Sequence, residues 1–286
     1  MPVSRFTFFE QSDAAILTAS SEAPTRPAVN LQDRYRTRVW RSTALAGQWV
    51  RLDFGAAVPL DTLALVSHNL SGGSQVTVQA GSSAGAGDLY RGAFAGADPI
   101  FGADDIGNDE MGADGYPLPG YETDWWPNGP VQVIYLPSAV EARYWQFSFD
   151  DPDNPDDYLE IGRLGLGFKI EYDRTFTEIS ECGVIHPGGV NYSLGGAAHL
   201  DPRQPYRQVS VEYQGVPQGA IWAVWQRLRQ RMTVGRDFVT DLYADGDFYP
   251  AQHEGRLYGH LAEAPPGLSI ATPIIANLTL TIRESV

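Results

Sequence analysis

One serine motif and a few histidines are the first places where this sequence could do chemistry. Gly81–Gly85 reads GSSAG after a predicted strand, as a nucleophile elbow does. An elbow needs a helix directly afterwards, whereas Ala, Gly and Asp follow here, so a flexible loop is the better interpretation and an esterase using Ser83 the weaker one. The five histidines form no H-E-x-x-H pair. His253, Glu254 and His260 come nearest to a metal set, but a predicted hairpin carries them, so surface or turn roles are expected.

Two loops are dense in carboxylates. DDIGNDE covers residues 104–110, and DDPDNPDD covers residues 150–157 with Asp151, Asp153 and Asp156 as candidate ligands. Oxygen ligands at this density suit Ca²⁺. Neither loop has the twelve-residue EF-hand pattern, and the prolines in the second loop also favour a stiff, solvated turn. Calcium is therefore one alternative and an ion-free acidic turn the other, and no other cofactor is predicted.

The candidate ligand-binding residues lie at a strand end and at an aromatic pair. His68 and Asn69 end a predicted strand and are expected to be exposed. Trp125 and Trp126 are adjacent, and two adjacent indoles cannot both point inward from one strand. One of them is available for a sugar face or a neighbouring subunit. No acid, base and nucleophile come together and no phosphate loop appears, so the sequence predicts a scaffold or a binding module and not an enzyme.

Composition narrows the class of protein. The 286 residues suffice for one large or two medium β domains, and 30 Gly, 20 Pro and 12% aromatic residues suit short strands joined by turns. No apolar run is long enough to span a membrane. The start, MPVSRFTFFEQSDAAILTASS, shows no secretory signal, so a cytoplasmic origin is expected. Cys182 is the only cysteine, which excludes an internal disulfide. A formal charge of -15 disfavours nucleic-acid binding, and suits either solubility or a channel through which DNA slides.

Strand signals dominate the first half of the chain. Two-residue alternation predicts strands in QWVRLDF, DTLALVSH and SQVTVQAG, and again in VQVIYL, ARYWQFSF and YLEIGRLGLGFKI. Between them, residues 81 to about 130 lose periodicity and fill with Gly and Asp. A connection this long suggests a functional or mobile loop. We therefore predict a first domain over residues 1–170 with a Gly/Asp-rich insertion at about 81–130.

The pattern changes near Ile170–Arg174, where we place a domain boundary. Residues 171–286 read as strands at QVSVEYQ, DFVTDLY and IIANLTLTIRES. Apolar residues recur at helical spacing over 218–232, with Pro217 before them and Gly235 after. This order predicts a smaller β sandwich with one flanking helix, so the whole chain is expected to be mainly β.

The motifs of the first half resemble the discoidin or galactose-binding-like jelly roll over about residues 10–170. They are N-L-x-D from Asn30, W-R-S from Trp40, W-V-R-L-D-F-G from Trp49, D-T-L-A-L from Asp61, A-R-Y-W-Q-F-S-F from Ala142 and E-I-G-R-L from Glu160. The resemblance implies a two-sheet sandwich whose alternating strand residues form the core. It also implies sugar or lipid binding through loops at one end.

The element order of the second half resembles the ring-forming module of tail-tube and distal tail proteins of long-tailed phages. This resemblance implies a homo-oligomeric ring in a virion tail tip or baseplate, assembled in the host cytoplasm, with tube, hub and tape-measure proteins as partners. The jelly roll would then face outward, toward a host surface glycan. Distal tail proteins commonly begin with this module, whereas here it comes last. The alternative is a free-standing carbohydrate-binding module with Trp125, Trp126 and His68 lining a sugar site.

Overall fold

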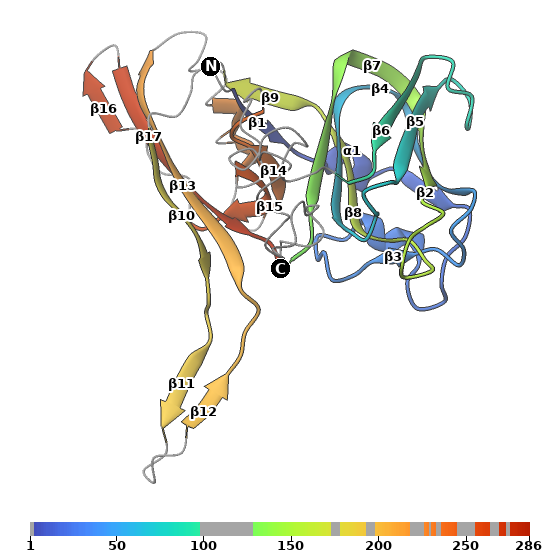
Figure 1. Ribbon diagram of the computed structural model, residues 1–286. Helices are drawn as coiled ribbons and strands as arrows, with labels where there is room; N and C mark the ends of the chain where they lie inside the picture. The colour runs from blue at the N-terminus through green and yellow to red at the C-terminus, as the bar shows by residue number, and fades with distance from the viewer. Residues whose placement is uncertain are drawn as a thin grey trace, which may run out of the picture.

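The chain folds into two β-rich parts that pack against each other (Figure 1). The computed structural model describes residues 3–97, 128–172, 178–192, 198–217, 226–228, 230–232, 236–244, 255–263, 269–272 and 275–286. Nearly all regular elements in these ranges are strands. The expected mainly β fold is thus confirmed.

The first part is a jelly roll. Its strands are β2 (Ile16–Ala19), β3 (Trp40–Arg41), β4 (Gln48–His68), β5 (Gln75–Gly81), β6 (Tyr90–Ala95), β7 (Val131–Asp150) and β8 (Glu160–Gly167). They are ordered β3-β8-β4-β7-β5-β6, and β2 pairs with β4. Two short helices, α1 (Glu10–Asp13) and η1 (Ala28–Gln32), lie before β3.

The two long strands, β4 and β7, serve both sheets of the sandwich. Residues 48–53 of β4 pair with β2 and with the end of β7, whereas residues 62–68 pair with β8 and the start of β7. The register shifts between Asp53 and Val58, where Gly55 has a φ of 74°. A bulge with a left-handed glycine bends a strand sharply. One strand can therefore cross from one sheet to the other.

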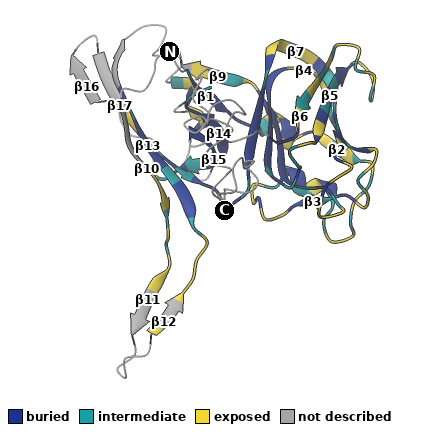
Figure 2. Ribbon diagram, viewed as in Figure 1, coloured by how far each residue is buried: buried dark blue, intermediate teal, exposed yellow. Residues whose placement is uncertain are grey.

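Residues of β4 are buried on both faces, which the two-residue alternation of DTLALVSH alone did not indicate. Leu63 and Leu65 point into the jelly-roll core with Trp145 and Phe147. Ala64 and Val66 face outward, yet they are also buried, in a second apolar cluster. Residues 60–66 of β4 are all buried, and this stretch is drawn in dark blue (Figure 2).

The second part is an eight-stranded sheet. Its strands are β1 (Ser4–Thr7), β9 (Lys169–Tyr172), β10 (Glu178–Ile185), β13 (Tyr206–Pro217), β14 (Phe238–Asp241), β15 (Arg256–Leu261), β16 (Ser269–Thr272) and β17 (Ile275–Glu284). The order is β10-β13-β17-β15-β14-β1-β9, with β16 on β17. β1 therefore lies between β14 and β9, and the jelly roll is inserted between two neighbouring strands, β1 and β9, of this second sheet. The chain begins with a strand of the part that the sequence places last.

The second sheet must be strongly curved. Its two edge strands, β9 and β10, are consecutive in the sequence, and Tyr172 and Glu178 are six residues apart. Six residues span at most about 21 Å, whereas six strand spacings in a flat sheet amount to about 29 Å. The curved sheet closes around an apolar core that contains Leu228 and Met232. Residues 226–228 and 230–231 are helical, within the helix predicted at 218–232, whose other residues lie outside the described ones.

The jelly roll and the second sheet meet along a buried interface, here called the seam. Its apolar cluster contains Phe9, Ala64, Val66, Val131, Val133, Val239 and Tyr258. Phe9 stacks on Tyr258 with ring centroids 6.4 Å apart. On β8, a Cβ at Gly165 would lie 2.4 Å from the Phe9 ring, so only glycine lets this ring approach the strand. The two parts therefore share packed side chains and are not joined by a flexible linker.

A two-stranded ribbon projects away from the body (Figure 1). β13 pairs with both β10 and β17 from Gln208 onward. Before that residue it pairs with β10 alone, and the ribbon continues into β11 (Gly189–Tyr192) and β12 (Ala198–Asp201). We call residues 186–205 the arm. Most of its described side chains are exposed (Figure 2).

Candidate functional site

A loop of the jelly roll, residues 33–39, carries the polar contacts of the seam. It follows η1, and its Arg36 side chain enters the interface and is only 3% exposed. The backbone carbonyl of Arg34 accepts a hydrogen bond from the Tyr258 hydroxyl at 3.1 Å. The sequence DRYRTRV therefore places one arginine inward, while its neighbours Arg34 and Arg38 stay exposed.

Arg36 belongs to a buried ionic network with Glu284 and Arg207. Its Nη1 donates to Oε1 of Glu284 at 3.0 Å, and Nη2 of Arg207 reaches the same oxygen at 3.0 Å. The other carboxylate oxygen accepts from Asn128 at 2.8 Å and from the Arg207 backbone at 2.9 Å. Arg36 also donates to the hydroxyl of Ser67 and to two backbone carbonyls. A buried charge is tolerated only when it is paired and hydrogen-bonded in this way.

The network keeps Glu284 ionised. Burial alone would raise the pKa of its carboxyl, but the guanidinium groups of Arg207 and Arg36 outweigh burial and hold that pKa below its ordinary value. Burial lowers the pKa of Arg36 to about 10. Glu284 and Arg36 are therefore both charged at neutral pH.

The pKa shift of Glu284 determines how its contribution to stability changes with pH. Because the folded-state pKa of Glu284 lies below its ordinary value of 4.5, the carboxylate contributes stability above that value and loses it as the pH falls through the folded-state pKa. We expect the gap in unfolding free energy between the wild type and Glu284→Gln to be widest above about pH 5 and to narrow below it. Urea unfolding across pH 3–7 measures this gap. A constant gap over that range would contradict the assignment.

The predicted pair His68 and Asn69 lies beside this network. Together they line a pocket of about 360 Å³ at the junction of the jelly roll and the base of the arm, with Arg36, Thr37, Val39, Ser67, Asn128, Gly129, Glu160 and Gln204. The preceding Ser67 has a φ of 53°, a left-handed conformation that is costly for serine and is fixed here by hydrogen bonds to Arg36 and the Asn128 carbonyl. His68 is 5% exposed, so the expectation of an exposed histidine is wrong. A strand end is therefore not by itself a sign of exposure: His68 still pairs with Ile161 of β8.

Asn69 holds the acidic loop of residues 150–157. Its Nδ2 donates to Asp156 Oδ2 at 2.9 Å and to the Tyr158 carbonyl, and its Oδ1 accepts from the Glu160 amide. Its amide is therefore occupied by the protein itself. This gives Asn69 a structural role in the loop.

The three candidate calcium ligands do not converge. Asp151 is 1% exposed, and both of its carboxylate oxygens accept hydrogen bonds from Ser71. Asp153 and Asp156 are exposed. Within the described ranges, no three His, Cys, Asp or Glu side chains are arranged to hold a metal ion. The calcium interpretation gains no support from this loop.

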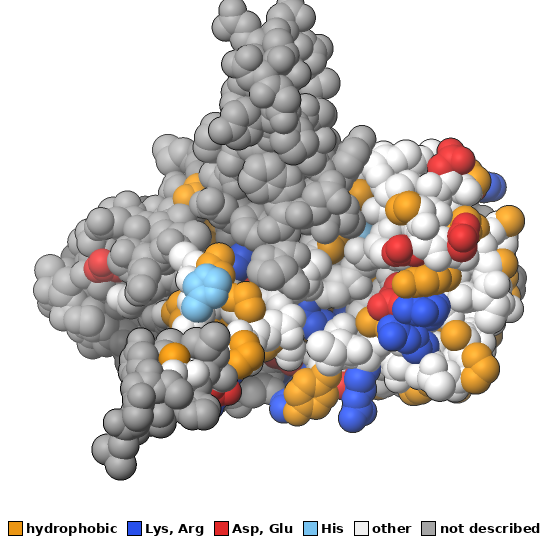
Figure 3. Space-filling model, turned by 60° about the horizontal axis from the view of Figure 1, so that its bottom comes forward, with side chains coloured by type: hydrophobic (Ala, Val, Ile, Leu, Met, Phe, Trp, Pro, Cys, Tyr) orange, Lys and Arg blue, Asp and Glu red, His pale blue; other side chains and the backbone are white. Residues whose placement is uncertain are grey.

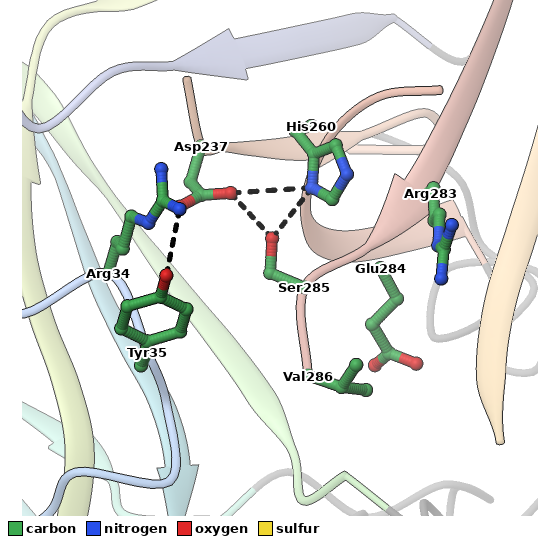
Figure 4. Close-up of a pocket in the computed structure, with 8 residues that line it drawn as sticks. All are labelled: Arg34, Tyr35, Asp237, His260, Arg283, Glu284, Ser285 and Val286. Carbon is green, nitrogen blue, oxygen red and sulfur yellow. Dashed lines mark hydrogen bonds and ion pairs between the residues drawn. The ribbon is translucent and has the colours of Figure 1, made fainter. Parts of the chain in front are cut away.

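Serine, histidine and aspartate meet in a second pocket, on the other side of loop 33–39 (Figure 4). Ser285 Oγ donates to Asp237 at 2.5 Å, and His260 Nδ1 lies 3.0 Å from the same hydroxyl. In a hydrolytic triad the two histidine nitrogens face serine and aspartate separately. Here Nδ1 faces both residues and the serine proton goes to the carboxylate. This cluster therefore lacks the relay that would activate a nucleophile.

The other candidates are placed apart from these pockets. The GSSAG loop is a turn on the outer face of the jelly roll, where Asp88 binds the backbone amide and the hydroxyl of Ser82, at 2.9 and 2.7 Å. Ser83 is exposed. Trp125, Trp126, His253 and Glu254 lie outside the described residues.

Sequence reasoning missed the charged residues of the seam. Arg36 and Glu284 are 248 positions apart, and no short motif joins them. The single available signal was the tandem DRYRTRV, which is unusually basic for a chain of charge -15. On the face turned forward in Figure 3, basic and acidic side chains of the described residues otherwise lie in small mixed groups. None of the described helices is long and apolar enough to cross a membrane.

Comparisons with known proteins show a likeness of fold. No protein-family model and no curated protein sequence matches the chain. A family 32 carbohydrate-binding module from C. perfringens NanJ, solved with galactose, is 14% identical over 57% of this chain and 98% of its own, with a TM-score of 0.36. A chitosan-binding module from Paenibacillus sp. IK-5 is 14% identical over 55% and 96%, with a TM-score of 0.37. The lectin domain of lectinolysin, solved with Lewis B antigen, is 14% identical over 56% and 98%, with a TM-score of 0.35. The mainly β fold rests on the strands themselves, and membership of the galactose-binding-like family stays a prediction.

Proposed function

We propose that this chain is a non-catalytic assembly subunit whose arm joins one copy to the next. The observation that carries the proposal is the arm itself, a two-stranded ribbon that leaves the body with its described side chains mostly exposed. An isolated two-stranded hairpin is at best marginally stable in water. Its outer edges also present unpaired backbone groups. A neighbouring copy that packs on the arm removes both costs.

The rest of the molecule suits such a role. The seam joins the jelly roll to the second sheet through an apolar cluster and a buried ionic network. A neighbouring copy bound to the arm would therefore hold both parts together. The formal charge of -15 opposes a grip on nucleic acid. The tail tip or baseplate ring of a tailed phage is the setting we propose, with the jelly roll outward. None of the solved structures reported above is a tail protein, so this setting rests on the sequence resemblance alone.

Removal of the arm tests the assembly role. Ile185 pairs with Tyr206, so the dipeptide Asn-Gly can replace residues 186–205 as a two-residue hairpin turn. We expect the full chain to form a closed oligomer in size-exclusion chromatography with light scattering and in negative-stain images, and the armless variant to be monomeric. Thermal unfolding of the variant checks that the body still folds without the hydrogen bonds that join Asn128 to Gln204 and Pro205 of the arm.

A control separates the arm from edge strands in general. β6 ends the jelly-roll sheet, and Arg91→Ala changes an exposed residue on it. This variant should assemble as the wild type does. A full chain that stays monomeric at high concentration, or an armless variant that still assembles, would refute the proposal.

Carbohydrate binding is the second candidate, and the pocket at His68 favours it. Its volume of about 360 Å³ falls in the range of small-molecule sites. Polar groups line the pocket. Among the described residues, Glu160 forms ion pairs with Arg26 and Arg41, and both arginines bind its Oε2 atom. The second carboxylate oxygen, the Thr37 hydroxyl and the side-chain oxygen of Gln204 can bind sugar hydroxyls, which both donate and accept. The Nε2 of Gln204 itself donates to Asn128 at 2.7 Å, which fixes the direction of that oxygen.

A glycan array followed by titration with galactose tests this candidate. Binding should be lost in Gln204→Ala and kept in Gln75→Ala, a matched change at an exposed glutamine on β5. An array without any hit, or a hit that is equally strong in both variants, would exclude the pocket as a sugar site. Trp125→Ala and Trp126→Ala test whether the aromatic pair takes part.

A further inference from the structure

The pocket of the Ser285–His260–Asp237 cluster is built by both parts of the protein. It measures about 290 Å³ and takes Arg34 and Tyr35 from loop 33–39 and the remaining lining residues from the second sheet. None of these residues belongs to the assembly arm. The pocket is therefore distinct from the arm, on which the proposed function depends.

Counting hydrogens fixes the tautomer of His260. A serine hydroxyl has a single proton, and Ser285 gives it to the carboxylate of Asp237 at 2.5 Å. The contact of 3.0 Å between Ser285 Oγ and His260 Nδ1 must then use a proton on Nδ1. In the neutral ring, Nε2 is left with a lone pair.

This lone pair is available to a ligand. In Figure 4 the second ring nitrogen points away from Asp237 and Ser285, toward the side of the pocket where Arg283 lies. The described part of the chain offers Nε2 no hydrogen-bond donor. A neutral imidazole whose first nitrogen is fixed by a partner, and whose second is open, presents a directed acceptor.

Two arginines add fixed positive charge to the same pocket. Arg283 is the cross-strand partner of His260 in the β15–β17 pair, and residues directly opposite have adjacent side chains. Its guanidinium lies 3.9 Å from the centroid of the Tyr206 ring. Stacking of this kind orients the planar group while its edge N–H groups remain free to donate. Arg34 lies at the opposite rim, where its Nη2 donates to the Tyr35 hydroxyl at 2.9 Å.

The negative groups of the pocket are turned away from this corner. Asp237 accepts a hydrogen bond from the Ser285 hydroxyl and lies on the Arg34 side of the pocket (Figure 4). Val286 lies at the end of the pocket that is far from His260. Glu284 is paired with Arg36 and Arg207 inside the seam. The corner between His260 and Arg283 thus combines one cation with a ring nitrogen that accepts a hydrogen bond when the imidazole is neutral.

We propose that this corner binds a small oxyanion that still carries a proton, with monohydrogen phosphate as the chemical type. Arg283 donates to the charged oxygens, and the remaining O–H of the anion donates to Nε2 of His260. Guanidinium groups bind such oxyanions through parallel N–H bonds. A fully deprotonated anion such as sulfate has no proton for Nε2, so the pocket selects between two anions of similar size.

Calorimetric titration of the full-length protein with inorganic phosphate and with sulfate, at pH 7.5 and equal ionic strength, tests the selection. Phosphate makes one hydrogen bond that sulfate cannot make, so it should bind at least about tenfold more tightly than sulfate. Arg283→Gln should abolish binding of both anions. Arg38→Gln, at an exposed arginine outside the pocket, should change neither.

A second variant isolates the nitrogen. Asparagine places an amide N–H where histidine has Nδ1, so His260→Asn can keep the bond to Ser285 while it removes the Nε2 acceptor. This variant should bind phosphate and sulfate about equally. Long-range ¹⁵N–¹H NMR of the wild type should show the proton of His260 on Nδ1. Equal binding of the two anions by the wild type would overturn the proposal. A proton found on Nε2 instead of Nδ1 would overturn it as well.

Discussion

Replacing Glu284 with alanine is expected to lower the free energy of unfolding by about 3–5 kcal/mol, the usual cost of removing one partner from a buried ion pair. The glutamate side chain is fully buried, and Arg36 and Arg207 are 3% and 6% exposed as side chains. Without the carboxylate, two guanidinium groups would remain in the seam without an opposing charge. Asn128 would also lose an acceptor at 2.8 Å. Urea unfolding at pH 7 measures the difference.

Glu263→Ala is the matched control, because Glu263 is exposed and follows β15, the strand that pairs with β17 beside Glu284. A surface change of this kind should stay within about 0.5 kcal/mol of the wild type. If Glu284→Ala also stayed within that range, the network would not be buried in solution and the seam would be looser than described. Glu284→Gln, which keeps the volume, should be intermediate.

The strand pattern predicted the jelly roll because core residues there alternate. In QWVRLDF and ARYWQFSF, the inward residues Leu52, Trp145 and Phe147 come at every second position, and the motif order added the topology. The alternation fails in β8, where Gly162, Gly165 and Gly167 replace outward side chains. Their meaning depends on what packs there, and a Cβ at Gly167 would lie 2.4 Å from the Phe8 carbonyl. Phe8 and Gly167 are 159 positions apart, and a packing partner at that distance cannot be read from a local pattern.

The same limit applies to the first strand and to the site. RFTFFE was assigned to the first part, although Ser4–Thr7 pairs with β14 and β9 of the second sheet. Strand pairing between distant segments leaves no trace in either segment alone. His68 was correctly placed at a strand end, but its burial depends on the surrounding tertiary structure and not on its position in the strand. The pocket with Asp237, His260 and Ser285 requires three separate segments to meet, so no spacing rule could find it.

Burial at the seam also predicts that the jelly roll and the second sheet unfold together. The seam joins strands from both ends of the chain, since β1 and β17 belong to one sheet and the jelly roll lies between them in the sequence. Opening the seam would expose its apolar cluster and separate Arg36 from Glu284. We therefore expect the jelly roll and the second sheet to unfold as one cooperative unit.

Phe9→Ala is expected to destabilise this unit by about 3–5 kcal/mol, as large-to-small changes in a packed core do. Phe9 is 1% exposed, stacks on Tyr258, and lies 5.6 Å below the guanidinium of Arg163. Truncation would leave a cavity, because Gly165 has no side chain to fill it. The charged Arg163 would also lose an aromatic face.

Phe168→Ala is the matched control, since this phenylalanine is 49% exposed and follows β8 directly. Calorimetry and urea unfolding of both variants should give a single transition. Only Phe9→Ala should lower the midpoint, and the slope of the unfolding free energy against urea concentration should stay unchanged. Two separate transitions in the wild type would show that the parts fold independently. A Phe9→Ala variant as stable as Phe168→Ala would show that the stacked pair with Tyr258 does not hold the seam together, and the rigid body proposed for assembly would lack its main apolar contact.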